Sequence, residues 1–391
     1  MHCCGRALAL DPFNVDALAN AGTLLWVGGN GEEAERLYLK AHELDPAHVG
    51  VMVNLAALRN DAADVEGAFQ WLNRASARSP DNPEVMWHKS LLELAMGDYA
   101  NGWKHYEAGL NSRAMRGTGP GFGIAPWNGD RCDRLLLWHE QGFGDTIQFV
   151  RYAKLCKERA ARVCVLCPTE LIALIKSCPF VDDAAEAVNA GDFDQQISIM
   201  SLPCLFGTTL ETVPAPIPYL FADDTLVPKW ASRIHGGKLK VGLVWAANLR
   251  RGQPRFRGID QRRSVSLQAM RAILEWPKAD FYSLQKGEPA REAEGSNVRD
   301  FMDEIADFAQ TAALIENLDL VISVDTAVAH LAGALGKPVW VLSRSDACWR
   351  WLRNRPDSPW YPTARVFGQP APGDWTSVIA KVAHELERVS K

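Results

Sequence analysis

The sequence predicts an α-helical repeat array followed by two α/β halves that face each other across a cleft. Three observations support this fold class: a 34-residue internal repeat over residues 1–112, a glycine- and proline-rich junction at 113–131, and short apolar strands alternating with helices over 132–225 and 239–391. With 391 residues, of which 47% are hydrophobic and 23% charged, the chain has the size and composition of a globular protein of two or three domains.

The repeat consists of four columns of similar residues, spaced 34 positions apart. Small residues let paired helices approach closely, a bulky column fills the space between them, and proline follows each second helix because it cannot continue one. The columns are Asp11-Pro12, Asp45-Pro46 and Ser79-Pro80; Ala34, Ala68 and Gly102; Tyr38, Leu72 and Tyr106; and Ala41, Ala75 and Gly109. The pattern resembles the tetratricopeptide repeat, a helix–turn–helix unit, in about three copies with a partial leading one. Because two glycines replace alanine in the last unit, we expect that unit to be looser.

The array differs in charge from the rest of the chain. Residues 1–112 carry eight Lys/Arg against fifteen Asp/Glu, a net charge of −7, whereas the remainder has a net charge of +2. We expect a spacer or a docking surface, since such arrays bind partners through extended concave faces. Residues 6–10 are typical of the end of an earlier helix, so we also expect a longer natural chain or another surface over that edge.

The α/β part shows two series of strands and helices, separated by a proline-rich stretch at 213–218. The expected strands are 135–138, 163–166, 197–199, 241–245, 281–284, 320–323 and 338–342; the expected helices are 146–159, 171–176, 267–275, 305–317, 327–335 and a closing C-terminal helix. Such alternation implies parallel strands with crossover helices. Ligands on such sheets bind beyond the carboxyl ends of the strands, where every candidate motif lies.

The first motif, residues 139–146, follows the first of these strands. Gly142 and Gly144 allow a tight turn and a close approach of the backbone to a ligand. Asp145 either accepts a proton from a sugar hydroxyl at the mouth of the cleft or caps the next helix. The spacing is not that of a dinucleotide-binding G-x-G-x-x-G motif.

The second motif runs from Ser323 into a helix of small residues. The first amides of that helix can receive a diphosphate, and Thr326 adds a hydroxyl donor. His330, four residues on, lies on the same face; it either donates a hydrogen bond to phosphate, neutralises the leaving group as a cation, or is structural. Asp325 would repel a diphosphate, so we expect it to cap the helix.

Two further basic features follow strand ends. The loop 248–263 holds six arginines against one acid, Asp260, and Lys286 follows the strand 281–284. Both could contact phosphate, and both could equally be solvated surface. Cys164 and Cys167 lie on a strand without a second pair at zinc spacing, so we expect no metal site.

Other classes of protein are disfavoured. No run approaches eighteen apolar residues, so no membrane-spanning helix is expected, and the N-terminus lacks the pattern of a secretory signal. Nine thinly spread cysteines suit a reducing cytoplasm. The weak charge bias gives no support for nucleic-acid binding.

Taken together, the motifs resemble the heptosyltransferase-like family of GT-B glycosyltransferases, and more closely bacterial tetratricopeptide-repeat proteins that end in such a module. The matching residues are Gly144-Asp145 and the turn at 325–330. The resemblance implies inverting transfer of a sugar from a nucleotide-sugar donor, without a metal or other cofactor, with Asp145 as general base and His330 assisting. It places the donor near Gly142, Gly144, Thr146, Asn248, Arg250, Lys286, Asp325, Thr326 and Ala327.

Two donor-facing loops depart from the family pattern, at 246–248 and 343–348. The sequence therefore leaves several functions open. The first is a glycosyltransferase that acts on a glycan, lipopolysaccharide-type or protein acceptor docked by the array, and the protein acceptor corresponds to the O-GlcNAc-transferase type. The second is a catalytically silent adaptor that retains only nucleotide affinity. A nucleotide-sugar epimerase fits the array less well.

Overall fold

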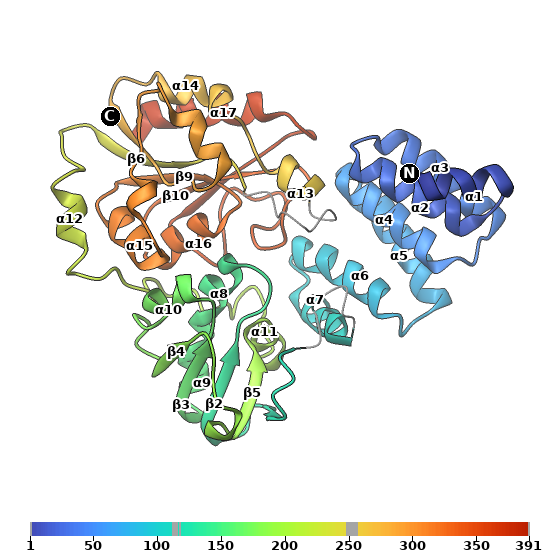
Figure 1. Ribbon diagram of the computed structural model, residues 1–391, viewed down its shortest axis with the longest axis horizontal. Coiled ribbons are helices and arrows are strands. Elements are labelled where there is room, and N and C mark those ends of the chain that lie inside the picture. The colour runs from blue at the N-terminus through green and yellow to red at the C-terminus, as the bar shows by residue number, and fades with distance from the viewer. Residues whose placement is uncertain (1, 112–115, 117–118, 248–256, 390–391) are drawn as a thin grey trace.

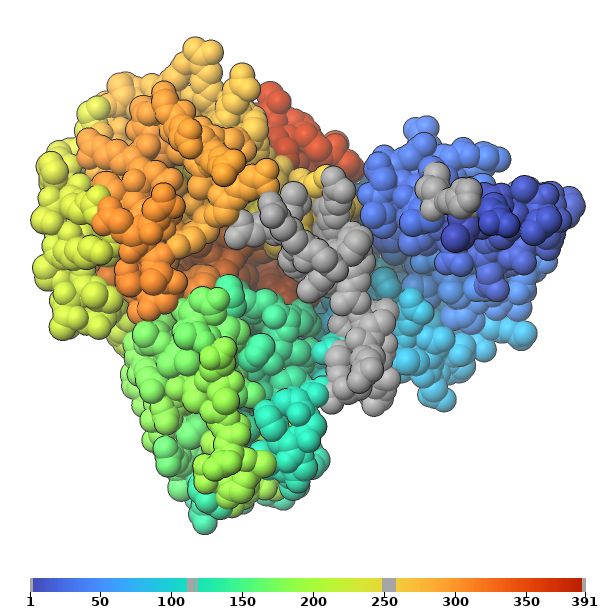
Figure 2. Space-filling view, viewed as in Figure 1, coloured from blue at the N-terminus to red at the C-terminus, as the bar shows by residue number. Residues whose placement is uncertain are grey.

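The computed structural model describes residues 2–111, 116, 119–247 and 257–389. Three bodies are visible in Figure 1: an array of paired helices and two α/β units, one above the other. Figure 2 shows the array packed along the side of the α/β units rather than extended away from them.

The array consists of helix pairs whose starts repeat every 34 residues. Helices α2, α4 and α6 begin at residues 15, 49 and 83, and α3, α5 and α7 begin at 31, 65 and 99. Asn or Asp side chains just before α2, α3, α5, α6 and α7 accept first-turn N–H groups, which explains these starts. The helices are α1 (His2–Leu10), α2 (Val15–Val27), α3 (Gly31–Leu44), α4 (Val49–Asp61), α5 (Val65–Arg78), α6 (Pro83–Met96) and α7 (Tyr99–Tyr106).

The repeated columns form the contacts between paired helices. Ala34, Tyr38 and Ala41 are fully buried, as are their counterparts one repeat later. Of the two glycines from which a looser last unit was expected, Gly102 allows close packing between α6 and α7. A Cβ at Gly102 would lie 2.7 Å from the side chain of Leu94.

The first α/β unit is a parallel five-stranded sheet in the order β1-β5-β2-β3-β4. Its strands are β1 (Ala125–Pro126), β2 (Cys132–Trp138), β3 (Ala160–Leu166), β4 (Asp183–Ala185) and β5 (Gln195–Ser198), and its helices α8 (Phe143–Phe149), α9 (Ala153–Lys157), α10 (Thr169–Ile175) and α11 (Leu202–Leu205). The sequence pattern did not indicate β1 and β4, which are two and three residues long. The expected helix 146–159 begins earlier, at Phe143, and is interrupted by a 3-10 turn at Val150–Tyr152.

The second unit is a parallel six-stranded sheet in the order β11-β10-β9-β6-β7-β8. Its strands are β6 (Leu239–Val244), β7 (Ala279–Ser283), β8 (Val298–Arg299), β9 (Leu320–Val324), β10 (Val339–Ser343) and β11 (Ala364–Gly368). The helices are α12 (Val227–Ala231), α13 (Arg257–Arg262), α14 (Arg271–Leu274), α15 (Phe308–Glu316), α16 (Ala327–Ala334) and α17 (Trp375–Val389). The chain order reverses between β6 and β9, so their carboxyl ends border a crevice suited to a ligand.

The last unit of the array shares a core with both α/β units. In α7, Trp103 packs edge-on against Phe149 at 6.0 Å and Trp349 at 5.3 Å between ring centres. Trp360 donates a hydrogen bond of 2.8 Å from Nε1 to the Tyr99 hydroxyl. Because these rings are buried together, the end of the array is fixed against the rest of the chain.

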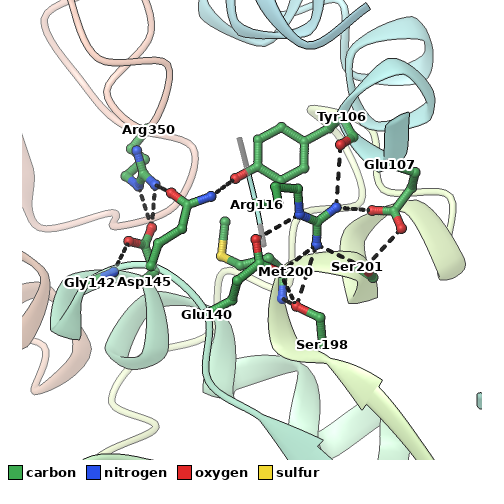
Figure 3. A network of polar contacts seen from close by, with 11 residues as sticks. Tyr106, Glu107, Arg116, Glu140, Gly142, Asp145, Ser198, Met200, Ser201 and Arg350 are labelled. Atoms are coloured by element: carbon green, nitrogen blue, oxygen red, sulfur yellow. Dashed lines mark hydrogen bonds and ion pairs between the residues drawn. The ribbon is translucent and has the colours of Figure 1, made fainter. Parts of the chain in front are cut away.

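Arg116 anchors the junction between the array and the first α/β unit. Its guanidinium has no exposed surface and forms hydrogen bonds of 2.7 and 2.8 Å with the two carboxylate oxygens of Glu140 (Figure 3). It also donates to Glu107 at 2.8 Å and to Ser201 at 3.0 Å. The junction, which its glycines and prolines indicated only as a boundary, therefore contains a buried structural contact.

Candidate active site

A cavity of about 1130 Å³ lies where the three bodies meet. Its walls are α2, α4 and α6 of the array, residues 141–145 after β2, and the carboxyl ends of β6, β7, β9 and β10. Eight of the predicted site residues line it: Gly142, Gly144, Asp145, Lys286, Asp325, Thr326, Ala327 and His330. The sequence motifs thus converge on one space, as expected for the carboxyl ends of parallel strands.

Asp145 lies in the first turn of α8, whose N-cap is Gly142. Its Oδ2 accepts the Gly142 N–H at 3.0 Å, and its Oδ1 accepts Arg350 Nε at 2.7 Å (Figure 3). The alternative in which Asp145 is itself the N-cap is wrong, because the helix begins earlier than its sequence indicated. The carboxylate nevertheless contributes to the cap from inside the helix.

Arg350 was not predicted as a site residue. Its side chain is 13% exposed, and its guanidinium lies 4.1 Å from the ring centre of Trp349. Burial would lower the pKa of Arg350, but Asp145 and further neighbours raise it well above the usual value. Arg350 therefore presents a permanent positive charge to the cavity, paired with Asp145.

The start of α8 turns through a non-glycine residue. Gln141 has a φ of 65°, in the left-handed region, so the tight turn predicted from Gly142 and Gly144 depends on this residue instead. Gly144 has a different function. A Cβ there would lie 2.8 Å from Cδ2 of His330 and 3.3 Å from Cα of Ala327, so the glycine lets α8 and α16 approach closely.

The start of α16 faces the cavity with its first amides. Thr326 is the N-cap in extended conformation, and its Oγ1 lies 3.0 Å from Ser323 Oγ. The N–H groups of Ala327 and Val328, the first two residues of the helix, have no acceptor within it. Both residues line the cavity, so an anion placed there would meet backbone donors and the positive end of the helix.

Asp325 does not cap α16, contrary to expectation. Its Oδ1 accepts the Trp351 Nε1–H at 2.7 Å, and its side chain is buried. Burial would raise the pKa of Asp325, but Arg263 and its other partners outweigh this effect and lower the pKa. The carboxylate is thus an ionised, internally paired group rather than a ligand for phosphate.

His330 is buried and neutral. Its Nδ1 lies 3.0 Å from the Tyr361 hydroxyl, and its ring stacks on Trp351 at 4.8 Å. Burial lowers the pKa of His330 to about 3, although Asp325 acts in the opposite direction. This lowered pKa disfavours the cationic alternative at neutral pH. With Tyr361 donating to Nδ1, the proton would reside on Nε2 and remain available to a ligand.

The other predicted site residues are placed differently. Thr146 is 1% exposed and does not line the cavity, because it lies on the buried face of α8. Lys286 is exposed and its ammonium donates to the backbone oxygen of Ile305. Asn248 and Arg250 lie outside the described residues.

Gln285 is a buried residue that sequence reasoning missed. Its Oε1 accepts the backbone N–H groups of Trp245 at 3.1 Å and Ala246 at 2.9 Å. The residue thereby fixes the chain as it leaves β6 at the edge of the cavity. Its position after a buried strand was the available signal.

The array contributes a charged wall. Asp61 at the end of α4 accepts Arg262 at 2.7 Å and Trp26 Nε1 at 2.8 Å, and Arg353 donates to Asn60 at 2.7 Å. Burial raises the pKa of Asp61 to about 6, even though Arg262 opposes the shift. These contacts hold the array against the second α/β unit.

The described residues contain no group of three or more His, Cys, Asp and Glu side chains arranged to hold a metal ion. Among the same residues, no helix has the length and apolar character required to cross a bilayer.

One segment of the cavity wall matches a known family. Residues 305–348 match glycosyltransferase family 9 (heptosyltransferase). This segment contains α15, β9, α16 and β10, and with them the 325–330 turn. The match supports a glycosyltransferase module in the C-terminal part of the chain.

Three further similarities extend beyond that segment. Over 425 residues the chain is 26% identical to Protein FlbA of Caulobacter vibrioides, covering 97% of this chain and 68% of that protein. Escherichia coli ADP-heptose LPS heptosyltransferase II superposes with a TM-score of 0.43 and 13% identity, over 66% of this chain and 98% of its own. An O-GlcNAc transferase from Thermobaculum terrenum gives a TM-score of 0.32 and 15% identity, over 99% and 88%.

Proposed function

We propose that this chain is an inverting glycosyltransferase that uses a nucleotide-sugar donor and no metal ion. The observation that carries the proposal is one cavity with the Asp145 carboxylate on one wall and the open N-terminus of α16 on the other. A proton acceptor facing an anion-binding helix end is the arrangement that transfer from a nucleoside diphosphate requires.

The donor diphosphate would rest against the amides of Ala327 and Val328. The Thr326 hydroxyl and the Nε2–H of His330 would add donors, and Lys286 a positive charge at the rim. These groups stabilise the charge that develops on the leaving diphosphate. Removing one such preorganised donor costs about 10²- to 10³-fold in turnover in enzymes that rely on them.

Asp145 would accept the proton of the acceptor hydroxyl as the oxygen attacks the anomeric carbon. The attack comes from the face opposite the diphosphate, so the configuration inverts. Because α8 and α16 touch at Gly144, the carboxylate and the first amides of α16 stay within one substrate length of each other.

The array would dock the acceptor as a tetratricopeptide-type surface. Trp26, Asn60 and Trp87 line the cavity from α2, α4 and α6, so an acceptor that enters there passes the array before it reaches Asp145. The array could bind a glycan, a lipopolysaccharide-type saccharide or a polypeptide in this way. A polypeptide acceptor corresponds to the O-GlcNAc-transferase type.

One observation favours a second candidate, a catalytically silent adaptor. Both carboxylate oxygens of Asp145 are occupied, one by Gly142 and the other by Arg350. A protein that retained this pairing with nucleotide bound would keep its affinity for nucleotide but lack a free base.

A panel of UDP-, ADP- and GDP-linked sugars tests both candidates. Calorimetry measures binding, and nucleotide release is then measured with candidate acceptors. For the enzyme we expect one donor to bind and Asp145→Asn to lower release by about 10²- to 10⁴-fold without weakening donor binding. Binding without release in the wild-type chain would establish the adaptor, and no binding of any donor would refute both.

A further inference from the structure

The contact between Asp145 and Arg350 closes one oxygen of the carboxylate, Oδ1, to an incoming acceptor. Asp145 Oδ1 accepts both Nε, at 2.7 Å, and a terminal nitrogen of the guanidinium, while Oδ2 accepts the Gly142 N–H at 3.0 Å. Both lone pairs of Oδ1 are thereby engaged by the guanidinium, so this oxygen can take a proton from a hydroxyl only after Arg350 leaves. The candidate base thus has one oxygen covered by a side chain from the other α/β unit (Figure 3).

Arg350 is otherwise supported by neutral groups. Trp349 stacks beneath it, Cys348 Sγ lies 3.2 Å from one terminal nitrogen, and Gln141 Oε1 accepts from the other at 3.3 Å. Gln141 in turn donates to the buried hydroxyl of Tyr106 in the array. A guanidinium held in this way keeps its place in the cavity if the carboxylate is exchanged for another anion.

The donor diphosphate, which is more negatively charged than a carboxylate, would bind next to Arg350. Trp351, the next residue after Arg350, donates a hydrogen bond of 2.7 Å to Asp325 and stacks on His330 at 4.8 Å, so Arg350 lies near the start of α16. The amides of Ala327 open at that same end and line the same cavity. A diphosphate bound there would carry more negative charge than a carboxylate, and its oxygens match the planar fork of arginine.

We propose that Arg350 exchanges Asp145 for the donor diphosphate, so that donor binding frees the base and precedes binding of the acceptor. This inference rests on the proposed glycosyltransferase function. It makes Arg350 a catalytic residue that touches the leaving group, and it explains why a blocked carboxylate occupies the position of a base.

The chemical step then balances. The acceptor hydroxyl gives its proton to Asp145 Oδ1, and its oxygen forms the bond to the anomeric carbon. The bond from that carbon to the diphosphate oxygen breaks, and its electron pair leaves on the diphosphate, which Arg350 neutralises. After the nucleoside diphosphate departs, Asp145 releases its proton to solvent and Arg350 returns to it.

The exchange predicts that one loss-of-function variant, Asp145→Asn, binds diphosphate more tightly than the wild-type chain. We measure binding of pyrophosphate, UDP, ADP and GDP by calorimetry in the full chain. Arg350→Gln should weaken binding about tenfold or more, since a charge-assisted hydrogen bond to phosphate is lost. Asp145→Asn should instead tighten binding, because it releases Arg350 without cost to the diphosphate.

Removing the negative charge of Asp145 could tighten diphosphate binding without any exchange. The double variant distinguishes these two explanations. In the Arg350→Gln background the exchange predicts that Asp145→Asn gives no further gain, whereas simple charge repulsion predicts the same gain as before. Arg388→Gln, at an exposed arginine of α17, is the matched control and should change nothing. Thermal melts confirm that each variant folds.

The outcomes separate this inference from the proposed function. If wild-type chain binds a diphosphate but Asp145→Asn binds it no more tightly, or gains equally in both backgrounds, the exchange is refuted and the donor site stands. If neither the wild-type chain nor Asp145→Asn binds any of the four probes, the donor site itself is refuted. Should Arg350→Gln fail to fold, Arg350→Lys keeps the charge without the fork and should bind more weakly than wild type.

Discussion

Gly144 and His330 bring the first helix of one α/β unit against a helix of the other. A Cβ on residue 144 would lie 2.8 Å from Cδ2 of the imidazole and 3.3 Å from Cα of Ala327. Gly144→Ala should therefore force α8 and α16 apart and lower the free energy of unfolding by about 1–3 kcal/mol, as overpacking does. Chemical denaturation measures this loss.

Gly142→Ala is the matched control for that prediction. Its Cβ would meet Asp145 Oδ2 at 3.5 Å, an ordinary contact, so the variant should lose far less stability. Equal losses for the two alanines would show that the helix contact has no special role.

Whether a feature of this site can be predicted from the sequence depends on how far apart along the chain the contacting residues lie. The start of α8 has local determinants, a glycine N-cap followed three residues later by an aspartate, although the sequence pattern placed the start at 146 rather than at Phe143. The same holds for the turn into α16, where a buried strand ends in Ser323 and a run of small residues follows. The alternation of strands and helices likewise indicated β2, β3, β5, β6, β7, β9 and β10, but it missed β11 (Ala364–Gly368), which is as long as β7, β9 and β10.

The polar partners could not be predicted, because they come from distant segments. Asp145 and Arg350 are 205 residues apart, and nothing around either residue marks it as the partner of the other. Asp325 was expected to cap α16. Instead it accepts a hydrogen bond from Trp351, which lies near it only in the folded chain. The neutral state of His330 has the same origin, since its pKa follows from burial among aromatic rings of other elements.

Titration of His330 gives a prediction on pH dependence. Its pKa in the folded chain is lowered to about 3 from an unfolded value of 6.5, so below pH 6.5 the unfolded chain binds a proton that the folded chain does not. Stability should therefore fall as pH decreases from 6.5 towards 3, by up to about 1.4 kcal/mol per pH unit from this one group. Above pH 6.5 the contribution is constant.

His330→Asn isolates that contribution. Urea unfolding of both chains at pH 7, 6 and 5 should give a shallower decline for the variant. His88, whose pKa burial lowers to about 4, adds the same decline to both chains and cancels in the comparison. Parallel declines would mean that the folded chain accommodates a charged His330.

Titration of Asp61 should change the stability with pH in the direction opposite to that of His330. Its pKa is raised from 3.8 to about 6, so its contribution to stability is full below pH 3.8 and is lost as pH rises through 6. The desolvation penalty of the ionised Asp61 carboxylate exceeds the stabilisation that the ion pair with Arg262 provides. Asp61→Asn should therefore raise the free energy of unfolding at pH 7.5, by roughly 1–3 kcal/mol, and this gain should vanish near pH 4.

A matched change at an exposed carboxylate tests that reasoning. Asp16 in α2 has a side chain that is 82% exposed, and Asp16→Asn should alter stability by less than about 0.5 kcal/mol at either pH. A destabilised Asp61→Asn at pH 7.5 would instead mean that the ion pair with Arg262 outweighs the desolvation of both groups.

Arg116 carries the largest predicted loss of stability. Its fully buried guanidinium pairs with Glu140, whose side chain is 3% exposed, so Arg116→Met leaves a carboxylate without its cation in the interior. We expect a loss of about 3–5 kcal/mol. Adding Glu140→Gln should recover part of it, because the stranded charge is then removed. Arg134→Met, at an exposed pair with Asp194, should cost less than about 1 kcal/mol. A similar small loss for Arg116→Met would show that Glu140 finds solvent or another partner, and that the junction does not depend on this pair.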